Sequence, residues 1–114
     1  MKVTLNEKGQ VVVVTVDRSI LQENVPLFKI RLSELLEEGK TRIVLDMSSA
    51  AYLSSMGVAV IVDIFKRTRK AGGGMNLACV NHLIRHLLDM TNVTRKVSLF
   101  DTVDEAVAAL QSDV

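Results

Sequence analysis

Two adjacent serines, Ser54 and Ser55, stand where an apolar, strand-like segment ends and the apolar stretch 56–62 begins. A serine hydroxyl at a helix start can accept a hydrogen bond from a first-turn amide, which is worth about 1 kcal/mol. A serine can also carry a phosphate, which adds a charge of about −1.5 to −2. Ser54 occupies the N-cap position and Ser55 the first helical position. Capping is the simpler account from local physics, and it explains one serine more readily than two.

Two histidines and one cysteine suggest metal or thiol chemistry, and each has a simpler explanation. His82 and His86 lie one helical turn apart, but the intervening residues include no glutamate base and no third ligand is evident, so we expect no metal site. Cys79 is the only cysteine, which excludes an internal disulfide. It falls in an apolar segment without a paired histidine signature, so we expect a buried, unreactive thiol within a strand.

The glycine run 72–74 and the basic run 66–70 raise the question of anion binding. Phosphate-binding glycine loops lead from a strand into a helix, whereas this run leaves a helix and enters a strand, so we expect a helix C-cap. Lysine and arginine near a helix C-terminus complement the helix dipole, and we therefore expect a solvated helix end. A role for the basic run in meeting an acidic partner is secondary.

Asp46 ends an apolar segment, as does the phosphorylated aspartate of response-regulator receivers. A receiver also needs a carboxylate pair after its first strand to hold Mg²⁺ and a lysine after its fifth strand. The sequence provides only Asp17 at the first place and Ser98-Leu99-Phe100-Asp101 at the second. A receiver-like phosphoprotein that uses Asp46 is therefore a minor alternative.

Composition limits the classes of protein to be considered. The 114 residues suit one compact domain, 1–114, and 48% hydrophobic, 24% charged and a net charge of +1 suit a soluble globular protein. This balance gives no reason to expect nucleic acid or an anionic membrane as a partner. The sequence has neither an apolar run of about 20 residues nor the apolar centre of a signal peptide, so we expect no membrane insertion and a cytoplasmic location.

Hydrophobic periodicity predicts alternating strands and helices after an N-terminal hairpin that turns at 8–10. The run 11–16 is apolar on both faces, which is typical of a central strand covered by helices. The pattern predicts an α/β fold with a mixed, largely parallel sheet of about five strands and about four helices. Expected strands after the hairpin are 41–47, 75–80 and 96–100. Expected helices lie within 22–40, over 55–71, over 82–90 after an Asn81 cap, and over 102–111, where Thr102 and Glu105 have capping-box spacing.

Four motifs in order give this chain a resemblance to the STAS domain family of anti-sigma factor antagonists. "IVLDMSS" is similar to the family's strand that ends in Asp-Leu-Ser, and "YLSSMGVAV" to its Asp-Ser-Ser-Gly turn opening an apolar helix. "RKAGGGMNL" resembles the Ala-Gly-Gly exit from that helix. "LLDMTNV" and "LFDTVDEAVAAL" resemble a Leu-Leu-x-Leu-Thr-Gly-Leu element and the C-terminal helix. The resemblance implies a STAS-type fold over most of the chain.

The resemblance also implies a function without enzymatic activity or cofactor. Ser55 matches the serine that a dedicated kinase phosphorylates, Gly57 the motif glycine and Asp46 the strand-end aspartate. Such a protein binds a kinase/anti-sigma factor and frees a sigma factor for transcription. Phosphorylation releases the complex until a PP2C-type phosphatase restores it. The implied partner-binding residues lie in the connection before the second predicted helix and on that helix: Ser54, Ser55, Met56, Gly57, Val60, Lys66 and Arg67.

This sequence departs from the family pattern at three places. Ser54 replaces the motif aspartate, Met56 replaces its second serine, and Arg18-Ser19-Ile20-Leu21 replaces an N-terminal Gly-x-Leu-Asp element. Ser54 is therefore the alternative phosphorylation site, and a divergent antagonist with its own kinase is expected. The alternative function is a non-switching STAS scaffold or subunit, in a transporter or a stressosome-like complex, in which both serines only cap a helix.

Overall fold

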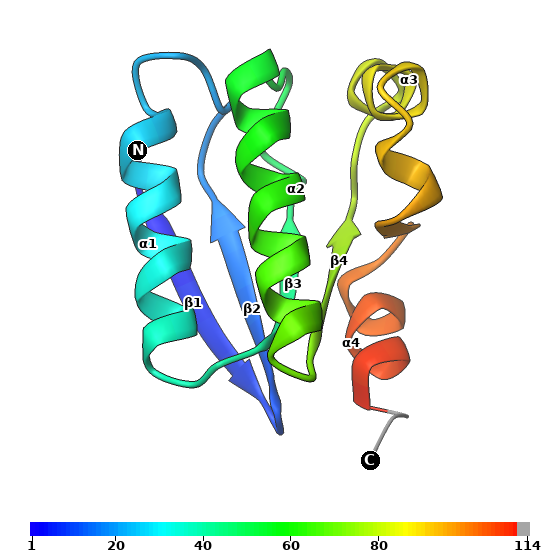
Figure 1. Ribbon diagram of the computed structural model, residues 1–114. Helices are drawn as coiled ribbons and strands as arrows, with labels where there is room; N and C mark the ends of the chain where they lie inside the picture. Colours follow the sequence, from blue (N-terminus) through cyan, green and yellow to red (C-terminus); the bar gives the residue numbers. More distant parts are fainter. Residues whose placement is uncertain (112–114) are drawn as a thin grey trace.

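The computed structural model describes residues 1–111, which form one five-stranded sheet with helices on both faces (Figure 1). The sheet order β1-β2-β3-β4-β5 follows the sequence. β1 pairs with β2 in antiparallel fashion, and the remaining pairs are parallel. The mixed sheet with its N-terminal hairpin confirms the predicted fold class. The strands are β1 (Val3–Lys8), β2 (Val11–Val16), β3 (Arg42–Asp46), β4 (Gly74–Ala78) and β5 (Ser98–Phe100).

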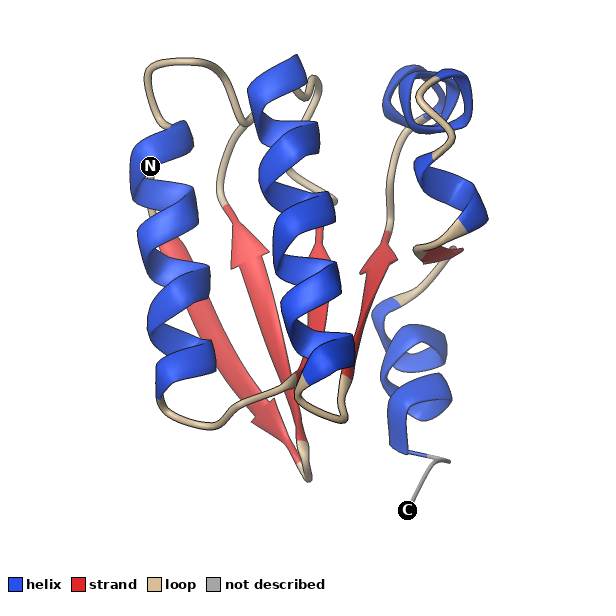
Figure 2. Cartoon of the chain, viewed as in Figure 1, coloured by secondary structure: helices blue, strands red, loops and turns tan. Residues whose placement is uncertain are grey.

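Three α-helices and one short 3₁₀ helix connect the strands, and a fourth α-helix follows β5 (Figure 2). They are α1 (Val25–Glu37), α2 (Ser55–Lys70), α3 (His82–Met90), η1 (Val93–Arg95) and α4 (Val103–Gln111). The 3₁₀ helix was not predicted, and it follows Asn92, whose φ is +62°. Asparagine tolerates this left-handed conformation better than most residues, which accounts for Asn92 where the family motif has glycine.

Alternate side chains of the strands pack into two separate cores, one on each face of the sheet. Val12 and Val14 of β2 pack with α1, α2 and α3 on one face, whereas Val11 and Val13 pack against α4 on the other. A strand buried on both faces cannot alternate apolar with polar residues, which explains the continuous valine run. The expectation of an internal strand at 11–16 is confirmed.

Two boundaries differ from the sequence-based prediction. The fourth strand ends at Ala78, so Cys79 follows β4 instead of lying within the strand, and its φ is +61°. The thiol is half-buried, not buried. The fifth strand spans only Ser98–Phe100, because residues 93–95 form the 3₁₀ helix and Lys96 ends it. Apolar periodicity carries no signal for either local change of direction.

The carboxyl ends of β2, β3 and β4 reach the same edge of the sheet, where the first turns of α1 and α2 and the whole of α3 also lie (Figure 1). The connections after these strands therefore meet in space. Ser54 and Ser55 are in the connection and helix that follow β3, so this edge holds the candidate site.

Candidate functional site

Ser54 caps α2 as predicted. Its backbone is extended, with φ −74° and ψ 162°, and its hydroxyl oxygen accepts a hydrogen bond from the Gly57 N–H at 3.1 Å. The Val58 N–H donates to the Ser54 carbonyl at 3.0 Å, which is the first main-chain bond of the helix. The Ser54 side chain thereby supplies an acceptor to one of the first backbone N–H groups of α2, which have no partner within the helix.

Ser55 is the first residue of α2 and is exposed. Among the described residues its side chain has no hydrogen-bond partner, in contrast to Ser54. An anion at this place would face the positive end of the helix dipole. The two serines are thus structurally distinct: Ser54 holds the helix start together, and Ser55 presents its hydroxyl to solvent.

We expect Ser54→Ala to lower the free energy of unfolding by about 1 kcal/mol, because the mutation removes the cap acceptor. Ser55→Ala should change it by less than about 0.5 kcal/mol, because this exposed side chain supports no contact in the fold. Urea denaturation of the two variants beside the wild type measures both values. Equal losses in the two variants would contradict the distinction between the serines.

Gly57 is buried beneath the first turn of α2. A Cβ at this position would lie 2.7 Å from Leu53 Cδ1 and 3.0 Å from Ile20 Cγ2, both of which belong to fully buried residues. The motif glycine therefore lets α2 start close against two core side chains. This packing explains Gly57 without any direct contact with a partner.

Met56, Tyr52 and Leu83 expose large apolar side chains at this edge, by 55%, 45% and 55% respectively. Met56 directly follows Ser55, and Tyr52 precedes it by three residues. Leu83 belongs to the first turn of α3, whose cap Asn81 donates to the Ala51 carbonyl at 3.0 Å. We call Tyr52, Met56 and Leu83 the apolar rim of Ser55. A partner that docks at this end of the fold would cover these exposed side chains.

The other predicted partner-binding residues separate into different environments. Val60 was expected on the exposed side of α2, and this was wrong: it is 7% exposed and packs in the core. Its accessible part lines a mainly apolar hollow between α1 and α2, together with Val25, Lys29, Met56, Ala59 and Asp63. Lys66 is exposed. Arg67 donates to Ser33 Oγ of α1 at 3.2 Å and pairs with Asp63 at 3.8 Å.

Lys66 and Arg67 also lie far from the serines along the helix. Eleven residues at 1.5 Å each separate Lys66 from Ser55, which is about 17 Å. The structure thus brings Ser54, Ser55, Met56 and Gly57 together and leaves the two cations near the opposite end of α2.

The Asp46 carboxylate accepts hydrogen bonds that hold the turn after β3 and join it to β2. One carboxylate oxygen accepts from the Ser48 N–H at 3.1 Å and the other from Thr15 Oγ at 3.3 Å. Asp17, the other carboxylate considered above, is bound by the Arg18 guanidinium and the Lys2 N–H, and these contacts lower its pKa to about 2. Both aspartates therefore have structural partners at the end of their strands.

The remaining candidates for chemistry are dispersed. Burial and the nearby Asp46 carboxylate raise the pKa of the Cys79 thiol, which disfavours the reactive thiolate. His82 and His86 are exposed on α3. Within residues 1–111, no group of three or more histidine, cysteine, aspartate or glutamate side chains could hold a metal ion.

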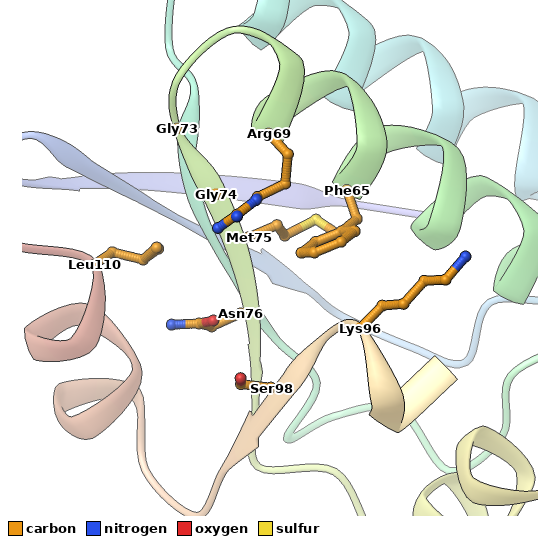
Figure 3. Close-up of a pocket in the computed structure, with 9 residues that line it drawn as sticks. All are labelled: Phe65, Arg69, Gly73, Gly74, Met75, Asn76, Lys96, Ser98 and Leu110. Atoms are coloured by element: carbon orange, nitrogen blue, oxygen red, sulfur yellow. The ribbon is translucent and has the colours of Figure 1, made fainter. Parts of the chain in front are cut away.

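The glycine run ends α2 and borders a shallow pocket of about 330 Å³ at the start of β4 (Figure 3). Ala71 is the C-cap of α2, and Gly72 directly after it has a φ of +88°, so the glycine run ends the helix as predicted. Arg69 and Lys96 line the pocket, but in Figure 3 the Arg69 guanidinium lies over the start of β4 and the Lys96 ammonium points away from it. The two cations do not meet around one anion.

Comparison with known proteins agrees with this architecture. The STAS domain family model matches residues 2–106. The chain belongs to the STAS domain family. A Thermotoga maritima protein described as a candidate anti-sigma factor antagonist is 33% identical over 98 residues, which are 85% of this chain and 87% of that protein.

Solved structures of other proteins superpose on the chain over nearly its whole length. The crystal structure of a candidate anti-sigma factor antagonist from Thermotoga maritima gives a TM-score of 0.91 at 29% identity, and the match covers 96% of this chain and 94% of that one. The Bacillus cell fate determinant SpoIIAA in its phosphorylated form gives a TM-score of 0.74 at 15% identity, with coverages of 95% and 98%. The second likeness establishes a shared fold.

No helix within residues 1–111 is long and apolar enough to cross a membrane.

Proposed function

We propose that this STAS protein is an anti-sigma factor antagonist without enzymatic activity that works as a partner switch in the cytoplasm. It binds a kinase/anti-sigma factor through the edge around Ser55, and this binding frees a sigma factor for transcription. Phosphorylation of Ser55 by that kinase releases the complex, and a PP2C-type phosphatase reverses it. The name of the relative from Thermotoga maritima supports the antagonist role.

The observation that carries this proposal is that Ser54 caps α2 whereas the Ser55 side chain is exposed. The Ser54 hydroxyl oxygen already accepts a hydrogen bond from the Gly57 N–H, so phosphorylation there would disturb the cap. Ser55 is exposed beside the apolar rim. These contacts favour Ser55 over Ser54 as the modified residue.

A phosphate on Ser55 can control binding without unfolding the domain. The N-terminus of α2 tolerates negative charge, so the fold persists. A docked partner would cover the apolar rim and remove water from the phosphate, and an unpaired dianion buried in an interface is costly. A loss of about 1.4 kcal/mol already lowers affinity tenfold.

The test combines three proteins with the kinase/anti-sigma proteins of the same cell. We expect ATP to add one phosphate, seen by intact mass, to the wild type but not to Ser55→Ala. Ser55→Asp should bind the partner at least about tenfold more weakly than Ser55→Ala. Ser54→Ala serves as the control and should still be phosphorylated.

The rival functions give different results in the same experiment. Unmodified protein that binds all variants alike would indicate a non-switching scaffold or subunit. A phosphate that is labile to hydroxylamine would indicate an acyl phosphate on an aspartate such as Asp46. Phosphate retained in Ser55→Ala but lost in Ser54→Ala would move the switch to Ser54.

A further inference from the structure

The connection that leads into α2 is held by side chains from two other parts of the chain. The Ser19 hydroxyl oxygen accepts hydrogen bonds from two consecutive amides, Ala51 N–H at 3.0 Å and Tyr52 N–H at 2.9 Å. From the other side, Asn81 Nδ2 donates to the Ala51 carbonyl at 3.0 Å and to the Ala50 carbonyl at 3.4 Å. These bonds supply partners to polar main-chain groups that a loop usually leaves to water.

The backbone of Ile20 completes this arrangement. Its N–H donates to the Tyr52 carbonyl at 3.2 Å, and its carbonyl accepts from the Ser54 N–H at 2.8 Å. Ile20 and Leu53 form an isolated parallel bridge, and both side chains are fully buried. Ser54, which caps α2 through its side chain, is thus anchored through its main chain to the segment 18–21, which we call the strap.

The strap is ordered on its own side by Asn24. The Asn24 Nδ2 donates to the Ser19 carbonyl at 2.9 Å, and its Oδ1 accepts from the Leu21 N–H at 2.8 Å. Asn24 is also the residue before α1, so the strap is fixed to the start of that helix. Ser19 therefore joins a segment tied to α1 with the connection that leads to α2.

We propose that Ser19 is a positioning residue that fixes the connection 50–54 and thereby sets how Ser55 and the apolar rim are presented to a partner. This inference rests on the proposed function. The Ser19 hydroxyl is the one side-chain oxygen in the strap that accepts from the connection, and two amides lose their acceptor if it is removed. A surface ordered before binding avoids the entropic cost of ordering it in the complex.

The strap coincides with the place where the sequence departs from the family's Gly-x-Leu-Asp element. Arg18 replaces the glycine and its guanidinium binds Asp17, while Leu21 replaces the aspartate and its N–H is bonded by Asn24 instead. Ser19 stands at the variable position between them.

The test uses two nearly isosteric substitutions, Ser19→Val and Ser19→Thr, which differ in whether a hydroxyl is present. Amide hydrogen exchange, followed by NMR on the whole protein, reports on Ala51 and Tyr52 directly. We expect exchange of these two amides to be on the order of tenfold faster in Ser19→Val than in Ser19→Thr, because an unmade hydrogen bond to a main-chain amide carries a penalty of this size. The Val44 amide in the core strand β3 is the internal reference and should be equal in both.

The second measurement is the affinity of the unphosphorylated protein for its kinase/anti-sigma factor. Ser19→Val should bind the kinase/anti-sigma factor several-fold to about tenfold more weakly than Ser19→Thr. Equal exchange of Ala51 and Tyr52 in the two variants would overturn the positioning role, and so would unequal exchange with equal affinity. A wild type that binds no such partner would overturn the proposed function itself, and this result is distinguishable because it does not depend on residue 19.

Discussion

Gly73→Ala should destabilise the protein by about 3 kcal/mol, the upper end of the range for forcing an extra carbon into a packed site. A Cβ on Gly73 would lie 1.9 Å from the Thr41 carbonyl oxygen and 2.5 Å from the Thr41 carbonyl carbon. These are backbone atoms, which cannot rotate aside. The clash also affects the Gly74 N–H, which donates to the same Thr41 carbonyl at 2.9 Å where β3 and β4 begin to pair.

Gly72→Ala is the matched control for this prediction. Gly72 has a φ of +88° but open space around its Cβ position, so alanine there should cost about 1–2 kcal/mol through backbone strain alone. Chemical denaturation gives both values. If Gly73→Ala were no less stable than Gly72→Ala, β3 and β4 could move apart at this end without lowering the free energy of unfolding, and the prediction would be wrong.

Met56→Ala should weaken binding of the kinase/anti-sigma factor about thirtyfold or more and leave stability almost unchanged. Met56 exposes 55% of its surface beside Ser55, and a methionine is flexible enough to fill an irregular partner pocket. Truncation of a hot-spot residue near the centre of an interface costs about 2 kcal/mol or more, and we expect Met56 to be such a residue. Alanine is a good helix former, so α2 should persist.

Ile30→Ala provides the comparison, because Ile30 on α1 is exposed to the same extent, 55%, but lies outside the apolar rim. Calorimetric or biosensor titration of both variants against the same partner measures the difference. Similar affinities for the two variants would mean that the partner docks elsewhere on the surface.

Strand and helix order followed from the sequence because the apolar periodicity is strong. The valines of β2, the helical spacing of Phe28 and Leu32 in α1, and the Ser54 and Asn81 caps are local signals, and each is found in the structure. The end of β4 at Ala78 was missed because Cys79 is apolar enough to continue a strand, although its backbone turns to a positive φ.

The site was less accessible to sequence reasoning because it depends on contacts between distant segments. Ser54 could be assigned as a cap from its position, but nothing in the local pattern indicated that Ser19 reaches Ala51 across 32 residues. Val60 was misplaced because α2 is covered on more than one side, by the sheet and by α1, so fewer of its positions face solvent than a single-sided helix would expose. Both the Ser19–Ala51 contact and the burial of Val60 follow only from the three-dimensional packing.

The second face of the sheet is covered by α4, the last of the described elements in the sequence. Val11, Val13 and Val44, in two of the earlier strands, depend on Ala106, Val107 and Leu110 for their burial. During synthesis, when N-terminal segments emerge first, the sheet would present a bare row of valines until α4 leaves the ribosome. A nascent chain stalled before residue 103 is therefore expected to aggregate or to recruit chaperones, because the sheet face formed by the earlier strands becomes protected only when α4 has been made.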